Sequence, residues 1–171
     1  SFSGDQIAAL SVRAIAGLTA DQIGAMSLDQ LDGLSTTQIG ALSAAQIAAL
    51  PSDLIDGMSP TKIAAISAKA ITGLTAERMA SLGPEQIAAL TTTQIRALKA
   101  EQISGLTAFQ TEAMSNGQIG ALSAAQISAL SVDAVKAWSP TQIAALSPAS
   151  ITGLTTDQIA ALDDSQIEGL T

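Results

Sequence analysis

The sequence contains no histidine, no cysteine and no tyrosine, and its only aromatic residues are two Phe and one Trp. It therefore lacks the usual ligands for zinc, copper, haem and iron–sulfur clusters, together with the commonest catalytic bases and nucleophiles. A metal ion would find only carboxylates to bind. Seven basic residues against fifteen acidic ones give a net charge of -8. This charge disfavours nucleic acid and anionic membrane surfaces as partners.

Long hydrophobic runs are absent too. No uninterrupted apolar run approaches the ~18 residues that a membrane span needs, so we expect no membrane insertion. The first residues, Ser1-Phe2-Ser3-Gly4, include no initiator Met and lack the basic and apolar regions of a signal peptide. We therefore expect the chain to be a fragment of a larger protein whose targeting signal lies elsewhere. The lack of cysteine is compatible with an exported bacterial protein.

A period of eight residues dominates what is present. From Ser3 to Leu170 the chain divides into 21 octapeptides without insertion or deletion, with the consensus S/T-x-x-Q-I-x-A-L. Position one is Ser or Thr in 17 copies, position four is Gln in 14, position five is Ile in 17 and position eight is Leu in 16. Position seven is always Ala, Gly or Ser. We expect residues 1–171 to form one repeat array.

The octapeptide period predicts helices. At about 100° per residue, the restricted positions one, four, five, seven and eight fill one continuous arc, and the variable positions two, three and six fill the rest. In a strand, positions five and eight would face opposite sides. One uninterrupted helix would rotate its apolar stripe by about 80° per octapeptide and bury nothing consistently. The sequence therefore predicts an all-α solenoid, or superhelix, with one very short helix per octapeptide and no β-sheet.

Local signals set the phase of these helices. S/T-x-x-Q is a capping box, in which the hydroxyl and the Gln side chain bind backbone N–H groups at the helix start. Four of the five prolines occupy position two, the first helical residue, where a missing N–H costs nothing: Pro60, Pro84, Pro140 and Pro148. Nine of the fifteen acidic residues occupy position three, in the first turn. We predict helices of about five to seven residues, joined by turns of one to three residues and stabilised by stacking.

Two further positions carry structural predictions. Gln at position four is expected to form a ladder between successive turns of the superhelix, because each helix break leaves backbone groups that need partners. The small residues at position seven suit a close approach between neighbouring helices, and Gly there also eases the exit from the helix.

The least regular copy runs from Thr107 to Met114, with Phe109 on the expected outer arc and Thr111 in the expected core. Ordinary repeat drift is the favoured interpretation, and a contact site or a local weak point are the alternatives. Phe109 and Trp138 mark mild clusters of unusual residues. We therefore take these two as the candidate contacts for a partner.

Candidate catalytic residues are better explained by the repeat. Ser59-Pro60-Thr61-Lys62 and Ser67-Ala68-Lys69 offer a Ser/Lys pair, the former in the S-x-x-K spacing of penicillin-binding enzymes, but both fall in the capping register. Asp32, Asp56 and Asp163-Asp164 suit a solvated face better than a glycosidase pair. No calcium-binding loop motif occurs. We predict no catalytic, cofactor-binding or metal-binding residue and no enzymatic activity.

Nucleic-acid binding is disfavoured for a second reason. The segment from Leu90 to Leu98 resembles the opening of many helix-turn-helix units, but only in its capping and amphipathic pattern. The seven basic residues form no stripe, and aromatic stacking platforms are missing.

The unit Leu154-Thr155-Thr156-Asp157-Gln158-Ile159-Ala160-Ala161-Leu162 resembles the octapeptide arrays of very large bacterial surface or secreted proteins, including adhesin-like and haemolysin-like ones. The resemblance covers essentially the whole chain. It implies a secreted or cell-surface location and transfers no functional residue.

Two functions follow from the sequence. We expect a non-enzymatic rod or spacer within a large exported protein. The alternative is a scaffold that presents positions two, three and six to a protein partner, as solenoids often do. The partner would be another protein or flanking domains of the same chain, and the oligomeric state is left open.

Overall fold

The computed structural model describes residues 3–170, which are the 21 complete octapeptides. Within these residues the chain forms 20 α-helices and one 3-10 helix, without a strand. The elements are α1 (Gly4–Ala8), α2 (Val12–Ala16), α3 (Ala20–Gly24), α4 (Leu28–Gly33), α5 (Thr36–Gly40), α6 (Ala44–Ala49), α7 (Ser52–Asp56), α8 (Pro60–Ala65), η1 (Ala70–Gly73), α9 (Ala76–Ser81), α10 (Pro84–Ala88), α11 (Thr92–Ala97), α12 (Ala100–Ile103), α13 (Ala108–Glu112), α14 (Asn116–Gly120), α15 (Ala124–Ala129), α16 (Val132–Lys136), α17 (Pro140–Ala144), α18 (Pro148–Ile151), α19 (Thr156–Ala160) and α20 (Asp164–Glu168). The predicted all-α solenoid with one helix per octapeptide is confirmed.

The helices are slightly shorter than the sequence predicts. They contain four to six residues, and two to four residues connect them. The backbone must become extended before the next helix starts: Leu34, at the end of α4, has ψ 130°, and Ser35, the N-cap of α5, has φ -69° and ψ 161°. A capping residue needs this extended conformation, so the requirement for a cap at every position one limits the helix length.

The helix starts follow the predicted phase. Ser35 Oγ accepts from Gln38 N at 3.3 Å, and Ser35 N donates to Gln38 Oε1 at 2.7 Å. These two reciprocal bonds make up a capping box. The four position-two prolines each stand at the first helical residue, where no backbone donor is needed: Pro60, Pro84, Pro140 and Pro148.

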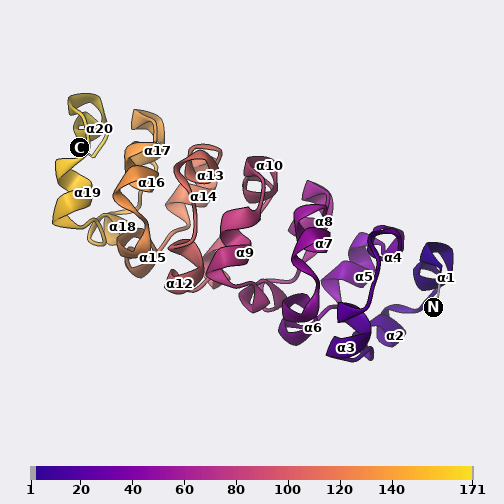
Figure 1. The fold of residues 1–171 in the computed structure, drawn as a ribbon. Helices are drawn as coiled ribbons and strands as arrows, with labels where there is room; N and C mark the ends of the chain where they lie inside the picture. The colour runs from indigo at the N-terminus through magenta and orange to yellow at the C-terminus, as the bar shows by residue number, and fades with distance from the viewer. Residues whose placement is uncertain (1–2, 171) are drawn as a thin grey trace.

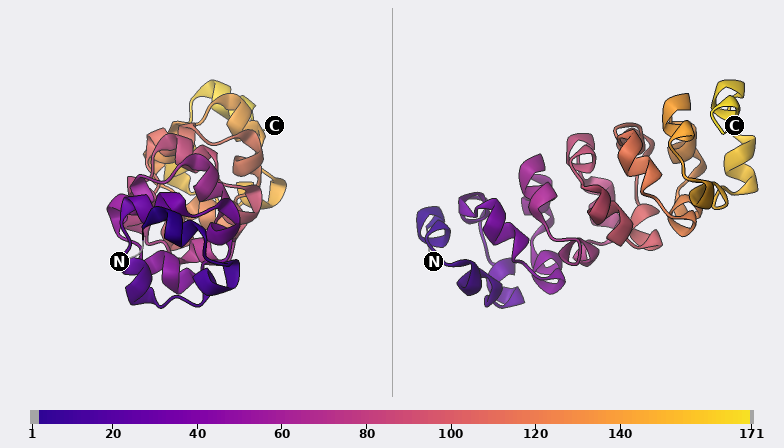
Figure 2. Two further views of the ribbon diagram at one scale, coloured as in Figure 1. Left: turned by 90° about the vertical axis from the view of Figure 1, so that its right-hand side faces the viewer. Right: turned by 180° about the vertical axis from the view of Figure 1, so that it is seen from behind.

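The array is elongated and gently curved, with the two chain ends at opposite ends of it (Figure 1). The view from behind shows the same progression, and the view along the array superimposes successive helices (Figure 2). Helices that pack closely lie three octapeptides apart, for example α1 with α4, α3 with α6 and α17 with α20. Each helix is therefore stabilised by neighbours from the adjacent turns of the superhelix rather than by its own length.

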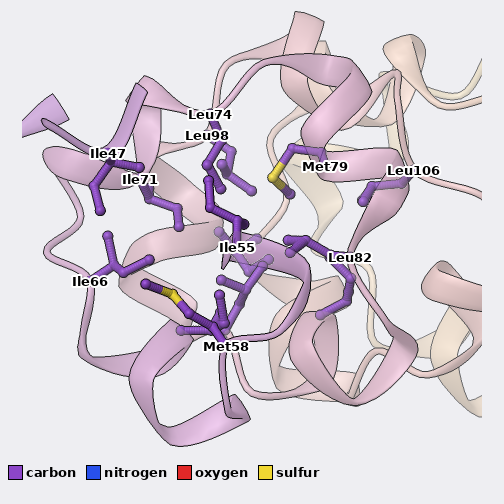
Figure 3. Packing of buried hydrophobic residues seen from close by; sticks show 14 of the residues in the cluster. Ile47, Ile55, Met58, Ile66, Ile71, Leu74, Met79, Leu82, Leu98 and Leu106 are labelled. Atoms are coloured by element: carbon purple, nitrogen blue, oxygen red, sulfur yellow. The ribbon is translucent and has the colours of Figure 1, made fainter. Parts of the chain in front are cut away.

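Positions five and eight build one continuous hydrophobic core. Ile47, Ile55 and Ile71 are at most 1% exposed. Figure 3 shows these side chains in one cluster with those of Met58 and Leu82, which stand at position eight of their octapeptides. Since Met fills irregular space well, the replacements of Leu and Ile by Met leave the core intact.

Glycine at position seven lies where two short helices nearly touch. A Cβ added to Gly73, Gly105 or Gly153 would overlap a backbone carbonyl of the helix three octapeptides earlier. Gly73 lies against the carbonyl of Ala44, and Gly153 lies against the carbonyl of Ala124. The predicted close approach at position seven is confirmed for these copies, because only glycine leaves enough room.

Candidate functional site: carbonyl cradles and the outer face

The backbone carbonyl oxygens at positions five, six and eight lie together at the end of each helix. We call this group of three acceptors a carbonyl cradle. Gln38 fills the cradle of the first octapeptide. Its Nε2 donates to Ile7 O at 3.5 Å, Ala8 O at 3.2 Å and Leu10 O at 2.8 Å. The same side chain that completes the capping box of α5 thus donates to carbonyls at the end of α1, where a short helix runs out of backbone donors. Ile7 O also accepts from Leu10 N at 3.0 Å.

This link recurs along the array. Every position-four Gln from Gln38 onward donates to the position-eight carbonyl 28 residues earlier, at 2.6 to 2.8 Å. These Gln side chains are 1–6% exposed. The ladder predicted from the sequence is therefore present, and it joins octapeptides four apart. Because helix packing joins octapeptides three apart, one turn of the superhelix takes between three and four octapeptides.

Two basic residues take the place of Gln. Lys62 Nζ donates to Leu31 O at 3.2 Å and Asp32 O at 2.9 Å, and pairs with Asp32 Oδ1 at 2.9 Å. Arg78 donates to Ile47 O, Ala48 O and Leu50 O at 2.6 to 3.2 Å. The cradle thus accepts a neutral amide, an ammonium or a guanidinium, because each presents N–H donors to carbonyl oxygens. This role was not predicted from the sequence, although both residues stand at position four.

In four octapeptides beyond the first turn, the position-four side chain does not fill the cradle of an earlier helix. Leu54, Ala70 and Ala134 carry no side-chain donor at position four. The Ser150 hydroxyl is occupied locally, with Ser147. The links between turns are therefore not uniform in strength.

The two candidate contact residues have opposite environments. The Phe109 side chain is 77% exposed, as expected for position three. Trp138 is 2% exposed, and it lies in the hydrophobic core. This corrects the expectation that Trp138 lies on a contact surface: position eight faces the core, and the indole occupies the place of the usual Leu. Of the two candidates, Phe109 is the one whose aromatic ring is exposed to solvent.

Thr111, the polar residue at a core position, is fully buried. Its Oγ1 donates to Ala134 O at 2.8 Å and lies 3.0 Å from Ala108 O. Ala134 O lies near the end of α16, where intrahelical donors run out. The hydroxyl therefore compensates a buried carbonyl, and the irregular copy from Thr107 to Met114 is integrated into the core.

The serines of both Ser/Lys candidates accept hydrogen bonds from backbone N–H groups at helix starts. Ser59 Oγ accepts from Lys62 N at 3.4 Å and so caps α8, whereas Lys62 Nζ reaches the cradle of an earlier helix. Ser67 Oγ likewise accepts from Ala70 N at 3.2 Å. Both hydroxyls serve as caps, in agreement with the interpretation from the sequence.

The acidic candidates are also used structurally. Asp32 pairs with Lys62, and Asp56 accepts from Ser81 Oγ at 2.7 Å. Asp163 caps α20: its Oδ1 accepts from Ser165 Oγ at 2.6 Å and from Gln166 N at 2.8 Å. These hydrogen bonds hold the pKa of the Asp163 carboxyl below its ordinary value of 3.8.

Open hollows lie between the helices of residues 3–170. One of 270 Å³ is lined by Ser3, Gly4, Asp5, Asp29, Asp32 and Gly33. Another of 390 Å³ is lined by Ala48, Ser52, Asp56, Thr75, Glu77, Arg78 and Ser81. Among residues 3–170, no three acidic side chains gather in a way that would bind a metal ion. None of the helices in the described part is long and apolar enough to cross a membrane.

Together, the repeated helices and their links define a tandem-repeat protein of the α-solenoid class. A family model described as the ALTTAQ repeat matches residues 28–60, 79–116, 112–148 and 139–171. These matches cover more than half of the chain, which therefore belongs to the ALTTAQ repeat family. Each match spans four to five octapeptides, slightly more than one turn of the superhelix. No curated protein matches the chain.

Proposed function

We propose that this protein is a non-enzymatic structural module, a rod or spacer that holds other parts of a large exported bacterial protein apart. The observation that carries the proposal is the recurrence of one link, from a position-four side chain to the carbonyl cradle four octapeptides earlier, between Gln38 and Gln166. Repeated links of this kind resist bending at any single point, because each turn is fixed to the preceding one.

The use of the polar residues supports the same proposal. Ser59, Ser67 and Asp163 cap helices, and Lys62 fills a cradle. A catalytic role would need these groups free to approach a substrate. The exported location is proposed from the resemblance to the arrays of bacterial surface proteins, and it is tested by protease treatment of intact cells that produce the protein.

A scaffold that binds a protein through its outer positions is the alternative, and the exposed ring of Phe109 favours it. A large exposed apolar side chain often marks a contact. A scaffold depends on which residues stand at the outer positions two, three and six, whereas a spacer does not.

Rigidity is tested by energy transfer between dyes. The chain contains no cysteine, so dye pairs can be attached to Asp21→Cys with Glu77→Cys and to Asp21→Cys with Asp133→Cys, all at exposed position-three sites. A rod gives a narrow distance distribution for each pair and much lower transfer for the more distant pair. Similar transfer for both pairs would contradict a rod.

Function is tested by replacement. In the parent protein, residues 3–170 are exchanged for an unrelated helical-repeat rod of equal length, and the parent's activity is measured. A spacer predicts retained activity, since only length and stiffness matter. Loss of activity in this exchange, reproduced by Phe109→Ser in the natural array, would favour the scaffold instead.

A further inference from the structure

The acidic residues are confined to part of the octapeptides. All fifteen fall in eleven of the 21 octapeptides, together with three basic residues, whereas the other ten octapeptides contain four basic residues and no acidic one. The first set therefore has a net charge of -12 and the second a net charge of +4. Helix dipoles favour an acid in the first turn of every helix alike, so they do not explain this division.

The division follows the superhelix. An acidic octapeptide is followed ten octapeptides later by another acidic one, and an acid-free octapeptide by another acid-free one. Since one turn takes between three and four octapeptides, three is the only whole number of turns that ten octapeptides make. At the resulting rotation of about 108° per octapeptide, the acidic octapeptides all fall within one arc of about 144°. We call this arc the acidic side; it comprises the octapeptides that begin at Ser3, Thr19, Ser27, Pro51, Thr75, Gly83, Lys99, Thr107, Ser131, Thr155 and Asp163.

Helix packing shows the same separation directly. Helices α10, α13, α16 and α19 pack each on the next, follow one another along the array (Figure 1), and belong to the acidic side. Their exposed position-three residues are Glu85, Phe109, Asp133 and Asp157. A second row of packed helices, formed by α6, η1, α11, α14 and α17, contains no acidic residue. We call it the acid-free row; its position-three residues are Ala45, Lys69, Thr93, Gly117 and Thr141.

Exposed apolar side chains stand among the carboxylates. Phe109 is 77% exposed and Val132 is 37% exposed, and they belong to the packed helices α13 and α16. Phe109 takes the place that Asp29 has ten octapeptides earlier. Glu112 stands three residues after Phe109 and so lies on the same face of α13. Neither the core nor a cap needs an exposed ring at position three, so the ring points to a contact.

We propose that the acidic side, around α10, α13 and α16, is a docking surface for a basic polypeptide in which Lys or Arg side chains alternate with apolar ones. The proposal goes beyond the rod function, and the rod stands whether or not a partner docks along it.

A basic polypeptide fits both the charge and the ring. Among residues 3–170, none of Glu85, Glu112 and Asp133 pairs with a basic side chain, so all three carboxylates are open to Lys or Arg of a partner. A guanidinium can also lie on the face of the Phe109 ring. Apolar side chains of the partner would cover Phe109 and Val132. Nucleic acid and anionic membranes are repelled by the same charge.

Fluorescence anisotropy with a labelled synthetic peptide tests the docking. The probe has about 16 residues in repeated Arg-Leu-Lys-Ala units, and we expect saturable binding to the full chain that weakens as the NaCl concentration rises. A peptide with Glu in place of Arg and Lys should not bind. A peptide with Ser in place of Leu should bind at least about fivefold more weakly, because it cannot cover the apolar residues.

Two variants alter the docking surface. Glu85→Gln with Asp133→Asn and Asp157→Asn removes charge from the row of α10, α16 and α19, and it should weaken binding by at least about tenfold. Phe109→Ser leaves the charge unchanged and should weaken binding by about fivefold. Circular dichroism verifies that each variant retains its helices, and Phe109→Ser carries the test if the triple variant unfolds.

The matched control changes the charge of the opposite side. Ala45→Lys with Thr93→Lys and Gly117→Lys shifts the net charge by the same three units as the triple variant, at exposed position-three sites of the acid-free row. This control should change binding by less than about threefold. An equal loss in the control and in the triple variant would overturn the proposal, because the peptide would then respond to net charge and not to the acidic side.

Two other results would overturn the proposal as well. The first is binding of the Glu peptide as tight as that of the basic peptide, because charge complementarity would then play no part. The second is a dimer of the chain, measured by sedimentation velocity, that Phe109→Ser abolishes. The ring would then be covered by a second copy of the chain and not by a basic partner.

Discussion

The side-chain amide of Gln102 donates to the carbonyl oxygen of Leu74, 28 residues earlier, at 2.8 Å. Its own Oε1 accepts from Lys99 N at 3.0 Å, so one side chain joins the start of α12 to the end of η1. It also donates to Ile71 O at 3.0 Å. All the polar atoms of a nearly buried amide are thereby used, and substitution affects two helices at once.

Replacing Gln102 by Leu should lower the free energy of unfolding by about 1–3 kcal/mol, because the Leu74 carbonyl and the Lys99 N–H lose their partners. Urea unfolding monitored by circular dichroism measures the change. Gln6→Leu is the matched control, since Gln6 makes the cap but fills no cradle within residues 3–170. Equal losses at the two positions would show that the link between turns contributes nothing beyond the cap.

Lys62→Gln should leave the free energy of unfolding within about 1 kcal/mol of the wild type, since an amide fills the same cradle and a surface ion pair adds little. The Asp32 side chain in that pair is 56% exposed. Lys62→Ala removes the donor and should cost more than Lys62→Gln. If both variants lose stability equally, then the charge of Lys62 matters rather than its hydrogen bonds to the backbone.

Two glycines should respond oppositely to alanine. Gly153→Ala forces a methyl group against the Ala124 carbonyl, and should destabilise by about 1–3 kcal/mol through overpacking. Gly117 lies inside α14 with only ordinary contacts around it, so Gly117→Ala should stabilise by up to about 1 kcal/mol through helix propensity. Thermal unfolding of both variants checks the pair, and a loss at Gly117 as large as that at Gly153 would contradict the close-packing argument.

Asp163 makes the last helix sensitive to acid. Its pKa is lower in the folded chain than the ordinary value of 3.8. Because the carboxyl loses its proton more easily in the folded chain, its ionised form stabilises the native state at pH values above about 3.8. That stabilisation is lost as the pH falls from about 3.8 through the lower pKa of the folded chain. NMR titration of the Asp163 carboxyl should give a midpoint below 3.8 and fraying of α20 over the same range. Asp163→Asn, whose side chain also caps, should remove the pH dependence, and a midpoint at or above 3.8 would contradict the capping role.

The sequence was sufficient for the register, the caps and the existence of a Gln ladder, because these depend on residue identity at fixed spacing. It did not reveal which turn each Gln reaches. That distance depends on the backbone angles between helices, such as ψ 130° at Leu34, which the consensus does not encode in an obvious way. For the candidate contacts, the predicted outward position of Phe109 is confirmed. The same register places Trp138, at position eight, in the core, because exposure follows the position in the octapeptide and not the rarity of the residue type.

The fixed reach of the Gln side chains also bears on folding. The Gln hydrogen bonds that join the turns span 28 to 31 residues in sequence at Gln38 and 28 to 30 residues at Gln166. The entropy lost on closing a loop depends on its length, and folding slows as contacts become more distant in sequence. Adding octapeptides would lengthen the array without lengthening any loop. Each new turn would therefore fold onto the preceding one against the same entropic barrier, however long the chain becomes.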